Sequence, residues 1–258
     1  MTSPRAIGVA ILGCVLLAIA LGPLVMTADP LRQDLARALS PPGWPFPLGS
    51  DALGRDVAAR LLHGARLSVS IAGAAVAIAS LVGALLGLLA AAMGGRVAHA
   101  VRLAADTALA LPNFLLVILI VALTTSGPLG IGMALTATLW VEPCRVVLLS
   151  AEQAARSAPV EAARLVGLPC GEIVARLILP PILAPLSAVV GLLFGQAILS
   201  IAALGFLGLG LRPPTPEWGA MILDSLPYIQ EAPLLFAAPA MGIVLMVAGL
   251  LLATGPRA

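Results

Sequence analysis

Residues Leu67–Met93 read LSVSIAGAAVAIASLVGALLGLLAAAM and indicate the fold class most directly. It contains no charged residue and exceeds the roughly 20 apolar residues that a helix needs to cross a bilayer. We therefore expect a transmembrane helix here, and the pattern recurs on both sides of it.

Five further apolar runs have a similar length and end at charges or at Gly and Pro. The first should be a retained span, because it is longer than the apolar core of about 7–15 residues in a signal peptide. Six spans would put both termini on one side, in an all-α integral membrane protein with six transmembrane helices. The five runs are Ala6–Met26, Leu103–Leu123, Pro128–Ser150, about Pro180–Leu204, and Pro233–Ala253.

Composition agrees with this fold class. Of the 258 residues, 60% are hydrophobic and 10% are charged, whereas a soluble domain has about 25% charged residues. The 3% aromatic content argues against an outer-membrane barrel with aromatic girdles. The net charge of +2 is too small to indicate a nucleic-acid partner. These values exclude a soluble enzyme, a disordered tail and a disulfide-stapled secreted domain.

The residue types present also exclude several kinds of catalytic and metal site. All 14 basic residues are Arg, so the chain has neither a P-loop lysine nor a Schiff-base lysine. Cys14, Cys144 and Cys170 are widely spaced and are expected to be small buried hydrophobes. His63 and His99 lie outside the spans, and no cluster has metal-ligand spacing. We predict a non-catalytic subunit that binds no metal and no cofactor.

Arginine counts favour a cytoplasmic N-terminus. In this orientation most of the outside arginines fall in one long polar segment, Thr27–Arg66, which also carries acidic residues. The expected organisation is residues 1–66 as first span, extracytoplasmic loop and amphipathic helix, residues 67–253 as transmembrane core with a cytoplasmic loop at 151–179, and 254–258 as a short cytoplasmic tail. The inside arginines would be Arg5, Arg96, Arg102, Arg145, Arg156, Arg164, Arg176 and Arg257, and the outside ones Arg32, Arg37, Arg55, Arg60, Arg66 and Arg212.

The first polar segment contains Leu48–Asp56, LGSDALGRD. Ser50 or Asp51 is expected to cap a helix in which apolar residues recur every four positions, as in Leu53-x3-Val57. Such a helix can lie at the membrane surface, and a simple connector is the alternative.

The second polar segment, Ala151–Leu179, predicts two short helices that form a compact knob. The first is delimited by Pro159 near its start and Gly167 after its end. The second spans about Gly171–Leu179 and is expected to stop at Pro180.

The third polar segment, Gly205–Ala232, is dense in Gly and Pro. Irregular backbone at membrane depth requires protein or a water-filled cavity around it, so this segment is a candidate border of a pathway or gate. An external loop with Trp218 as an interface anchor is the alternative.

Polar residues within the spans are candidates for function. We expect Asp106 to pair with Arg102, and Glu142 with Arg145, on their own helices. Asn113 and Gln196 could line a passage or bond neighbouring helices. The candidates for a translocation pathway or gate are Asn113, Glu142, Gln196, Arg212 and Trp218.

Three motifs together resemble the permease subunits of bacterial ABC importers for peptides and nickel, specifically the second permease of the dipeptide and oligopeptide group. Leu48–Asp56 with Gly64-Ala65-Arg66 looks like the family's G-T-D-x-L-G-R-D…G-A-R. Glu161-Ala162-Ala163, Gly167, Leu177, Leu179 and Pro180 look like E-A-A-x3-G-x9-I-x-L-P. Leu204–Met221 is similar to S-F-L-G-L-G-x-x-P-P-x-P-x-W-G-x-M, and the likeness covers about Leu48 to Ala248.

The resemblance implies a type I ABC importer permease fold in the bacterial cytoplasmic membrane. The loop would hold a coupling helix seated on a cytoplasmic ATPase, with Glu161 paired to that ATPase, bonded within the loop, or solvated. Residues 254–258 replace the family's usual polar tail, so a C-terminal ATPase contact is not carried over. The coupling-loop residues would be Glu161, Ala162, Ala163, Arg164, Gly167, Leu177 and Pro180, and the extracytoplasmic motif Gly49, Asp51, Gly54, Arg55 and Asp56.

The implied partners are a homologous permease in a heterodimer, two ATPase subunits that bind ATP and Mg, an extracytoplasmic substrate-binding protein, and the lipid bilayer. The implied cargo is di- or oligopeptides, with nickel, an opine-type metal chelate or haem as alternatives. A stand-alone secondary transporter or channel is the alternative of another class, although the sequence lacks the internal repeat typical of such carriers.

Overall fold

The computed structural model describes residues 4–25, 29–124 and 127–255, and every regular element in these ranges is helical. Outside the helices, one isolated bridge joins Ser50 and Asp56. The predicted end of the first span at Met26 and the tail residues 256–258 lie outside the described residues. The elements are α1 Pro4–Val25, η1 Leu35–Arg37, α2 Val57–Met93, α3 Gly95–Leu109, α4 Asn113–Leu123, α5 Pro128–Leu139, α6 Val141–Ala155, α7 Ala158–Leu165, α8 Cys170–Ile173, η2 Val174–Ile178, α9 Leu179–Phe206, α10 Trp218–Ser225, η3 Leu226–Tyr228 and α11 Pro233–Thr254.

Five helical segments of the described chain are long and apolar enough to cross a membrane, and a bent pair makes a sixth candidate. The prediction of an all-α membrane protein is confirmed. The five segments are Pro4–Gly22, Val57–Met93, Pro128–Ala155, Cys170–Phe206 and Pro233–Thr254, and the pair is α3 with α4.

The second span begins earlier than expected. Helix α2 runs without a break from Val57 to Met93, so the predicted surface helix and the predicted span at Leu67 are one element. Leu53, which was expected to start the apolar stripe, lies in the loop before the helix.

The third span is not the straight helix expected over Leu103–Leu123. Helices α3 and α4 meet at an angle of 86° across a short break. Pro112 explains the break, because proline disfavours helical backbone at the residue before it and lacks an N–H for the helix ladder. The next helix starts at Asn113, directly after that proline.

Prolines act differently in the two following spans. Helices α5 and α6 join at Trp140, where Pro143 cannot donate to the carbonyl of Leu139. The expected stop at Pro180 is wrong, because the helix continues from Cys170 to Phe206. A wider π-helical turn, η2, precedes this proline, and the N–H of Leu179 reaches back to the carbonyl of Val174.

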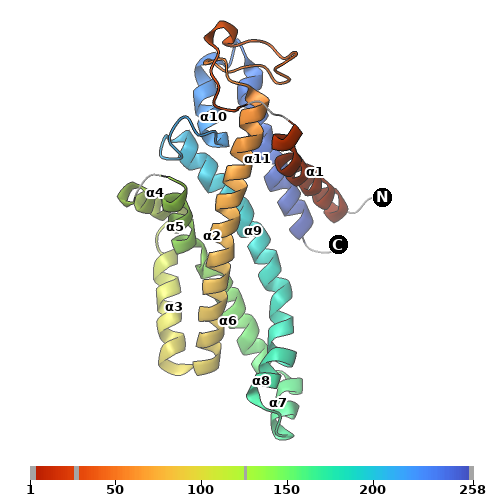
Figure 1. Cartoon of the computed structure of the whole chain (residues 1–258). Helices are drawn as coiled ribbons and strands as arrows, with labels where there is room; N and C mark the ends of the chain where they lie inside the picture. The colour runs from red at the N-terminus through yellow and green to blue at the C-terminus, as the bar shows by residue number, and fades with distance from the viewer. Residues whose placement is uncertain (1–3, 26–28, 125–126, 256–258) are drawn as a thin grey trace.

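Figure 1 shows an elongated molecule with two distinct ends. Helices α7 and α8 lie at one end, and the polar segment before α2 lies with α10 at the other. Helices α1 and α11 are antiparallel neighbours: a Cβ atom on Gly8 would lie 2.5 Å from the backbone N of Ala253. The start of α1 and the end of α11 therefore lie on one side, as six spans require.

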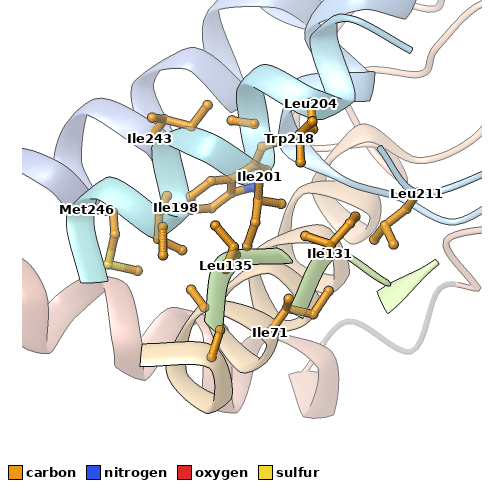
Figure 2. Packing of buried hydrophobic residues seen from close by; sticks show 14 of the residues in the cluster. Ile71, Ile131, Leu135, Ile198, Ile201, Leu204, Leu211, Trp218, Ile243 and Met246 are labelled. Carbon is orange, nitrogen blue, oxygen red and sulfur yellow. The ribbon is translucent and has the colours of Figure 1, made fainter. Parts of the chain in front are cut away.

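The core lies where α2, α5, α9, α10 and α11 meet. Figure 2 shows Trp218 of α10 among aliphatic side chains from these helices. Small residues allow close approach, since a Cβ atom on Gly83 would lie 2.3 Å from the carbonyl oxygen of Trp140. Fully buried members include Ile131, Leu135, Ile198, Ile201, Leu204 and Met246.

The cysteines differ in burial. Cys144 is buried as expected, whereas Cys14 and Cys170 are exposed, so the expectation of burial is wrong for these two. Cys14 lies on α1, whose apolar surface is largely exposed in the isolated chain. Such a surface suits contact with lipid, where an apolar side chain needs no protein cover.

Candidate functional site

The motif that was predicted to be extracytoplasmic folds around Asp51. Its Oδ1 accepts the backbone N–H groups of Leu53 and Arg55, at 2.9 Å and 3.0 Å. Its Oδ2 lies 2.6 Å from Nε of Arg55 and 3.4 Å from Nε of Arg60. Asp224 of α10 lies 4.0 Å from Nη2 of Arg55. We call Asp51, Arg55, Arg60 and Asp224 the Asp51 cluster.

Two motif glycines are required by the packing of this loop. Gly54 has φ +69°, and a Cβ atom there would lie 1.8 Å from the carbonyl oxygen of Asp34. Gly49 has φ +81°, and its Cβ atom would lie 2.7 Å from the carbonyl oxygen of Ser40. Any other residue would therefore strain the backbone and collide with the chain.

The cap of α2 is Asp56 rather than the expected Ser50 or Asp51. Its carboxylate accepts the N–H groups of Ala58 and Ala59, at 2.9 Å and 3.3 Å. Ser50 instead accepts the N–H of Ser40 at 2.9 Å and ties the loop together. Within the motif, Ser50 and Asp51 therefore stabilise the loop, and Asp56 caps the helix that follows.

A buried carboxylate starts α10. Glu217 is 1% exposed, and its two oxygens accept the N–H groups of Gly219 and Ala220, each at 2.9 Å. Burial raises the pKa of this carboxyl above its ordinary value, and the two backbone hydrogen bonds oppose the shift. Gly205 makes room for it, since a Cβ atom there would lie 1.8 Å from Oε2 of Glu217.

Trp218 anchors α10 to α2. The indole is 2% exposed, and its Nε1–H donates to the carbonyl oxygen of Leu61 at 3.0 Å. This contact closes the third motif onto the start of the second span, and it places the side chain in the core rather than at an exposed position.

The predicted coupling loop forms a projecting knob, which we define as residues 157–168 and call the α7 knob. Val160 and Ala163 of α7 are buried against Ile173, with Leu177 packed beside them. The opposite face is open: Leu165 is 84% exposed and Val166 is 75% exposed. The knob thus has a fixed base and an uncovered apolar tip.

Charged side chains flank that tip. Glu161, Ala162 and Arg164 are all exposed on α7. Within the described ranges no hydrogen bond or ion pair reaches the carboxylate of Glu161, which leaves a contact with another subunit or with solvent as its environment. Pro180 lies exposed beyond the knob, at the start of α9.

Gly167 ends α7 in a two-bond turn. The N–H of Leu168 donates to the carbonyl of Ala163 at 3.0 Å, and that of Gly167 to the carbonyl of Arg164 at 3.1 Å. This pattern is a Schellman motif, in which the glycine adopts a left-handed conformation, here with φ +76°. A Cβ atom on Gly167 would have no atom of the described chain within 4 Å beyond its own neighbours, so only the backbone demands glycine.

Two ion pairs join α3 and α6, where pairs within single helices were expected. Arg145 of α6 pairs with Asp106 of α3, and Arg102 of α3 pairs with Glu152 of α6. The expectation that Arg102 pairs with Asp106, and Arg145 with Glu142, is therefore wrong. Side chains on adjacent helices reach each other here because α3 and α6 pack together.

The five pathway candidates lie in separate elements, and no described contact brings them together. Asn113 begins α4, and Glu142 is exposed in the first turn of α6. Gln196 is half-buried in α9, and Arg212 is exposed in the following loop. Trp218 is buried in the core. A role of these five residues in a translocation pathway stays a prediction. Among the described residues, no cluster of His, Cys, Asp or Glu could hold a metal ion.

Three polar residues at the end of the molecule that holds the Asp51 cluster were not predicted as site residues. Arg60 was counted only among the outside arginines, Glu217 falls at an unspecified position of the Leu204–Met221 motif, and Asp224 lies beyond that motif. The available signal was an acidic residue directly before Trp218 at a helix start, which is typical of a side chain that accepts helix N–H groups.

Comparison with known proteins identifies the family to which this chain belongs. Residues 83–255 match the family described as binding-protein-dependent transport system inner membrane component. The chain is 38% identical over 231 residues to the di/tripeptide transport system permease protein DppC of Pseudomonas aeruginosa strain UCBPP-PA14, covering 87% of this chain and 76% of that protein. It is 36% identical over 251 residues to the dipeptide transport system permease protein DppC of Alkalihalophilus pseudofirmus, covering 94% and 80%. The corresponding protein of Haemophilus influenzae is 30% identical over 233 residues, covering 88% and 79%.

Proposed function

Because this chain belongs to the family of binding-protein-dependent transport system inner membrane components, we propose that it carries di- or oligopeptides and that α7 is its coupling helix. As an ABC importer permease it is a non-catalytic, multi-pass subunit of the inner membrane, and ATP is bound by a partner ATPase. A stand-alone carrier or channel is set aside, since the family works with a binding protein.

The observation that carries the coupling assignment is the α7 knob. A surface with Leu165 and Val166 open to solvent at a polar end of the molecule needs a protein partner to cover it. Its base is rigid, because Val160 and Ala163 are buried against α8 and the turn that follows. A rigid helix joined directly to a 37-residue helical segment, Cys170–Phe206, suits the transfer of a nucleotide-driven motion into the membrane.

This assignment fixes the proposed orientation. If α7 meets a cytoplasmic ATPase, the end with the Asp51 cluster is extracytoplasmic, since the two lie at opposite ends of the molecule. The N-terminus then faces the cytoplasm, as the arginine counts favour. The extracytoplasmic end is where the substrate-binding protein delivers cargo, and two ATPases and a homologous permease complete the proposed assembly.

The peptide cargo is supported by the printed names of the relatives, which describe dipeptide and di/tripeptide transport. Nickel, an opine-type metal chelate and haem remain the alternatives in the same family. The test is uptake of radiolabelled L-alanyl-L-alanine, nickel and haem by cells with and without the gene. Loss of dipeptide uptake alone supports the proposal, and unchanged dipeptide uptake with loss of another cargo contradicts it.

The energy source is tested on the same cells. Uptake should stop when the cytoplasmic ATP pool is depleted, and it should persist when only the proton gradient is dissipated. Uptake that follows the proton gradient and not ATP would contradict an ATP-driven assembly.

A further inference from the structure

A cavity of about 500 Å³ lies at the end of the molecule opposite the α7 knob, between the start of α2, α10 and the start of α11. Sites for small molecules commonly have volumes of about 300–1,000 Å³. All four members of the Asp51 cluster line this cavity, so it combines charge with an apolar wall. The apolar wall includes Val57, Met221, Leu223 and Leu235.

The cluster contains more buried positive charge than its close carboxylate can satisfy. Asp51 serves both Arg55 and Arg60 while accepting two backbone N–H groups. The side chain of Arg60 is only 4% exposed, and its Nη1 is buried with no hydrogen-bond partner in the described part of the chain. A buried cationic donor without an acceptor is costly, so the cluster is incomplete without a further anion.

At the open side of the cavity, a carboxylate is available to bind a cation. The side chain of Asp224 is 58% exposed, and its nearest cation, Nη2 of Arg55, lies 4.0 Å away. This separation is too long for a hydrogen bond. The carboxylate of Asp224 can therefore accept hydrogen bonds from a second cation that enters the cavity.

We propose that this cavity binds the two charged ends of a short peptide, with the peptide carboxylate at Arg60 and the peptide ammonium at Asp224. The assignment rests on the proposed function, because it takes a peptide as the cargo. Guanidinium groups donate to carboxylates through paired, charge-assisted hydrogen bonds, which a neutral amide reproduces poorly. The apolar wall then accommodates peptide side chains, and the carboxylate lies deeper than the ammonium because Arg60 is more deeply buried than Asp224.

The direct test is binding of radiolabelled L-alanyl-L-alanine to the full chain in lipid nanodiscs, measured by equilibrium dialysis. We expect the variants Arg60→Gln and Asp224→Asn to weaken binding at least about tenfold, as loss of a charge-assisted hydrogen bond does. Arg37→Gln is the matched control, because this arginine pairs with Asp34 at an exposed site outside the cavity, and binding should be unchanged. Binding by Arg60→Gln or Asp224→Asn that equals the wild type would overturn the proposal.

A ligand series keeps the test valid if Arg60→Gln does not fold. The C-terminal amide and the N-acetyl form of the dipeptide each remove one charged end, and each should bind the wild-type chain at least about tenfold more weakly. Equal binding of the dipeptide and both derivatives would overturn the assignment.

The carboxylate could instead come from a side chain of the binding protein. In that case the wild-type chain would bind no dipeptide, while Arg60→Gln would weaken association of the peptide-free binding protein, and the peptide assignment would be overturned. Cellular uptake separates this inference from the proposed function: dipeptide uptake unaffected by both variants overturns only the cavity, whereas no dipeptide uptake by the wild type overturns the cargo itself.

Discussion

The Asp51 cluster and the α7 knob lie at opposite ends of the molecule and use their motif residues in opposite ways. Around Asp51, the motif carboxylates accept backbone N–H groups, and the glycines have no room for a side chain. On α7, the motif residues Glu161 and Arg164 are exposed, and Gly167 has open space around it. The first motif therefore determines how this chain folds, whereas the second presents a surface that this chain alone leaves uncovered.

The largest difference between the two motifs is expected when the same substitution is made at a glycine of each. Gly54→Ala should destabilise the protein by more than about 3 kcal/mol, because its Cβ atom would lie 1.8 Å from a carbonyl oxygen at positive φ. Gly167→Ala should cost about 1 kcal/mol, since only the left-handed backbone opposes it. Thermal unfolding of both purified variants measures the difference, and equal losses of stability would show that the two motifs are not distinct.

A bulkier residue at the second glycine should affect transport more than folding. Gly167→Val places a β-branched side chain in a left-handed conformation, which should open the Schellman turn and shift the exposed tip at Leu165. We expect dipeptide uptake to fall to background while the amount of protein in the membrane stays at the wild-type level. Normal uptake by this variant would contradict the coupling assignment.

Substitutions at the N-caps of α2 and α7 should differ less in their effect on stability. Asp56→Ala removes a carboxylate that accepts two N–H groups of α2, and should cost about 1–2 kcal/mol. Ser157→Ala should cost about 0.5 kcal/mol, because the hydroxyl of Ser157 makes no capping bond to α7 and donates only to the carbonyl of Ala154, which also accepts the N–H of Ser157. Melting temperatures of the two variants provide the measurement, and a larger loss for the serine variant would reverse the comparison.

The smallest expected effect is a pH dependence at Glu217. Because the folded state raises the pKa of this carboxyl, the folded protein binds its proton more readily than the unfolded chain does. Its contribution to stability is thus fully present below the unfolded pKa and is lost as pH rises through the folded pKa. The melting temperature of the wild type minus that of Glu217→Gln should accordingly be largest at acid pH and decrease as pH rises.

An exposed residue provides the control for this titration. Glu231→Gln makes the same substitution at a carboxylate that lies on the surface, and its melting temperature is measured in parallel. A difference at Glu217 that increases with pH would mean that its charged form is the one the fold favours.

The spans could be predicted from the sequence because apolar runs of sufficient length have one stable arrangement in a bilayer. The breaks in the helices could not be predicted, because the effect of a proline on a helix depends on the backbone before it. Pro112 and Pro143 coincide with breaks, whereas Pro180 follows a π-helical turn and the helix continues. Local capping was likewise ambiguous, since Ser50, Asp51 and Asp56 are all good cap residues and only the loop geometry selects Asp56.

The pairing of charges was also beyond the sequence. Spacing within one helix suggested Arg102 with Asp106, but packing of α3 on α6 offered Arg145 a partner on the neighbouring helix. The same limit applied to Arg60, whose buried environment depends on a loop before α2 and on Asp224 far along the chain. The motif residues could be recognised in the sequence. Which of them are buried in contacts within the chain, and which are exposed, depends on the three-dimensional structure.

Co-purification of the ATPase subunits with variants of the exposed tip tests most directly whether the α7 knob is a docking surface. Leu165→Asp places a charge on a side chain that is 84% exposed, and Leu35→Asp makes the same change at a leucine that is 69% exposed at the other end of the molecule. We expect Leu165→Asp to lose the ATPase subunits while its melting temperature is unchanged, and Leu35→Asp to retain them. Equal recovery of ATPase with both variants would show that the α7 knob is not the docking surface.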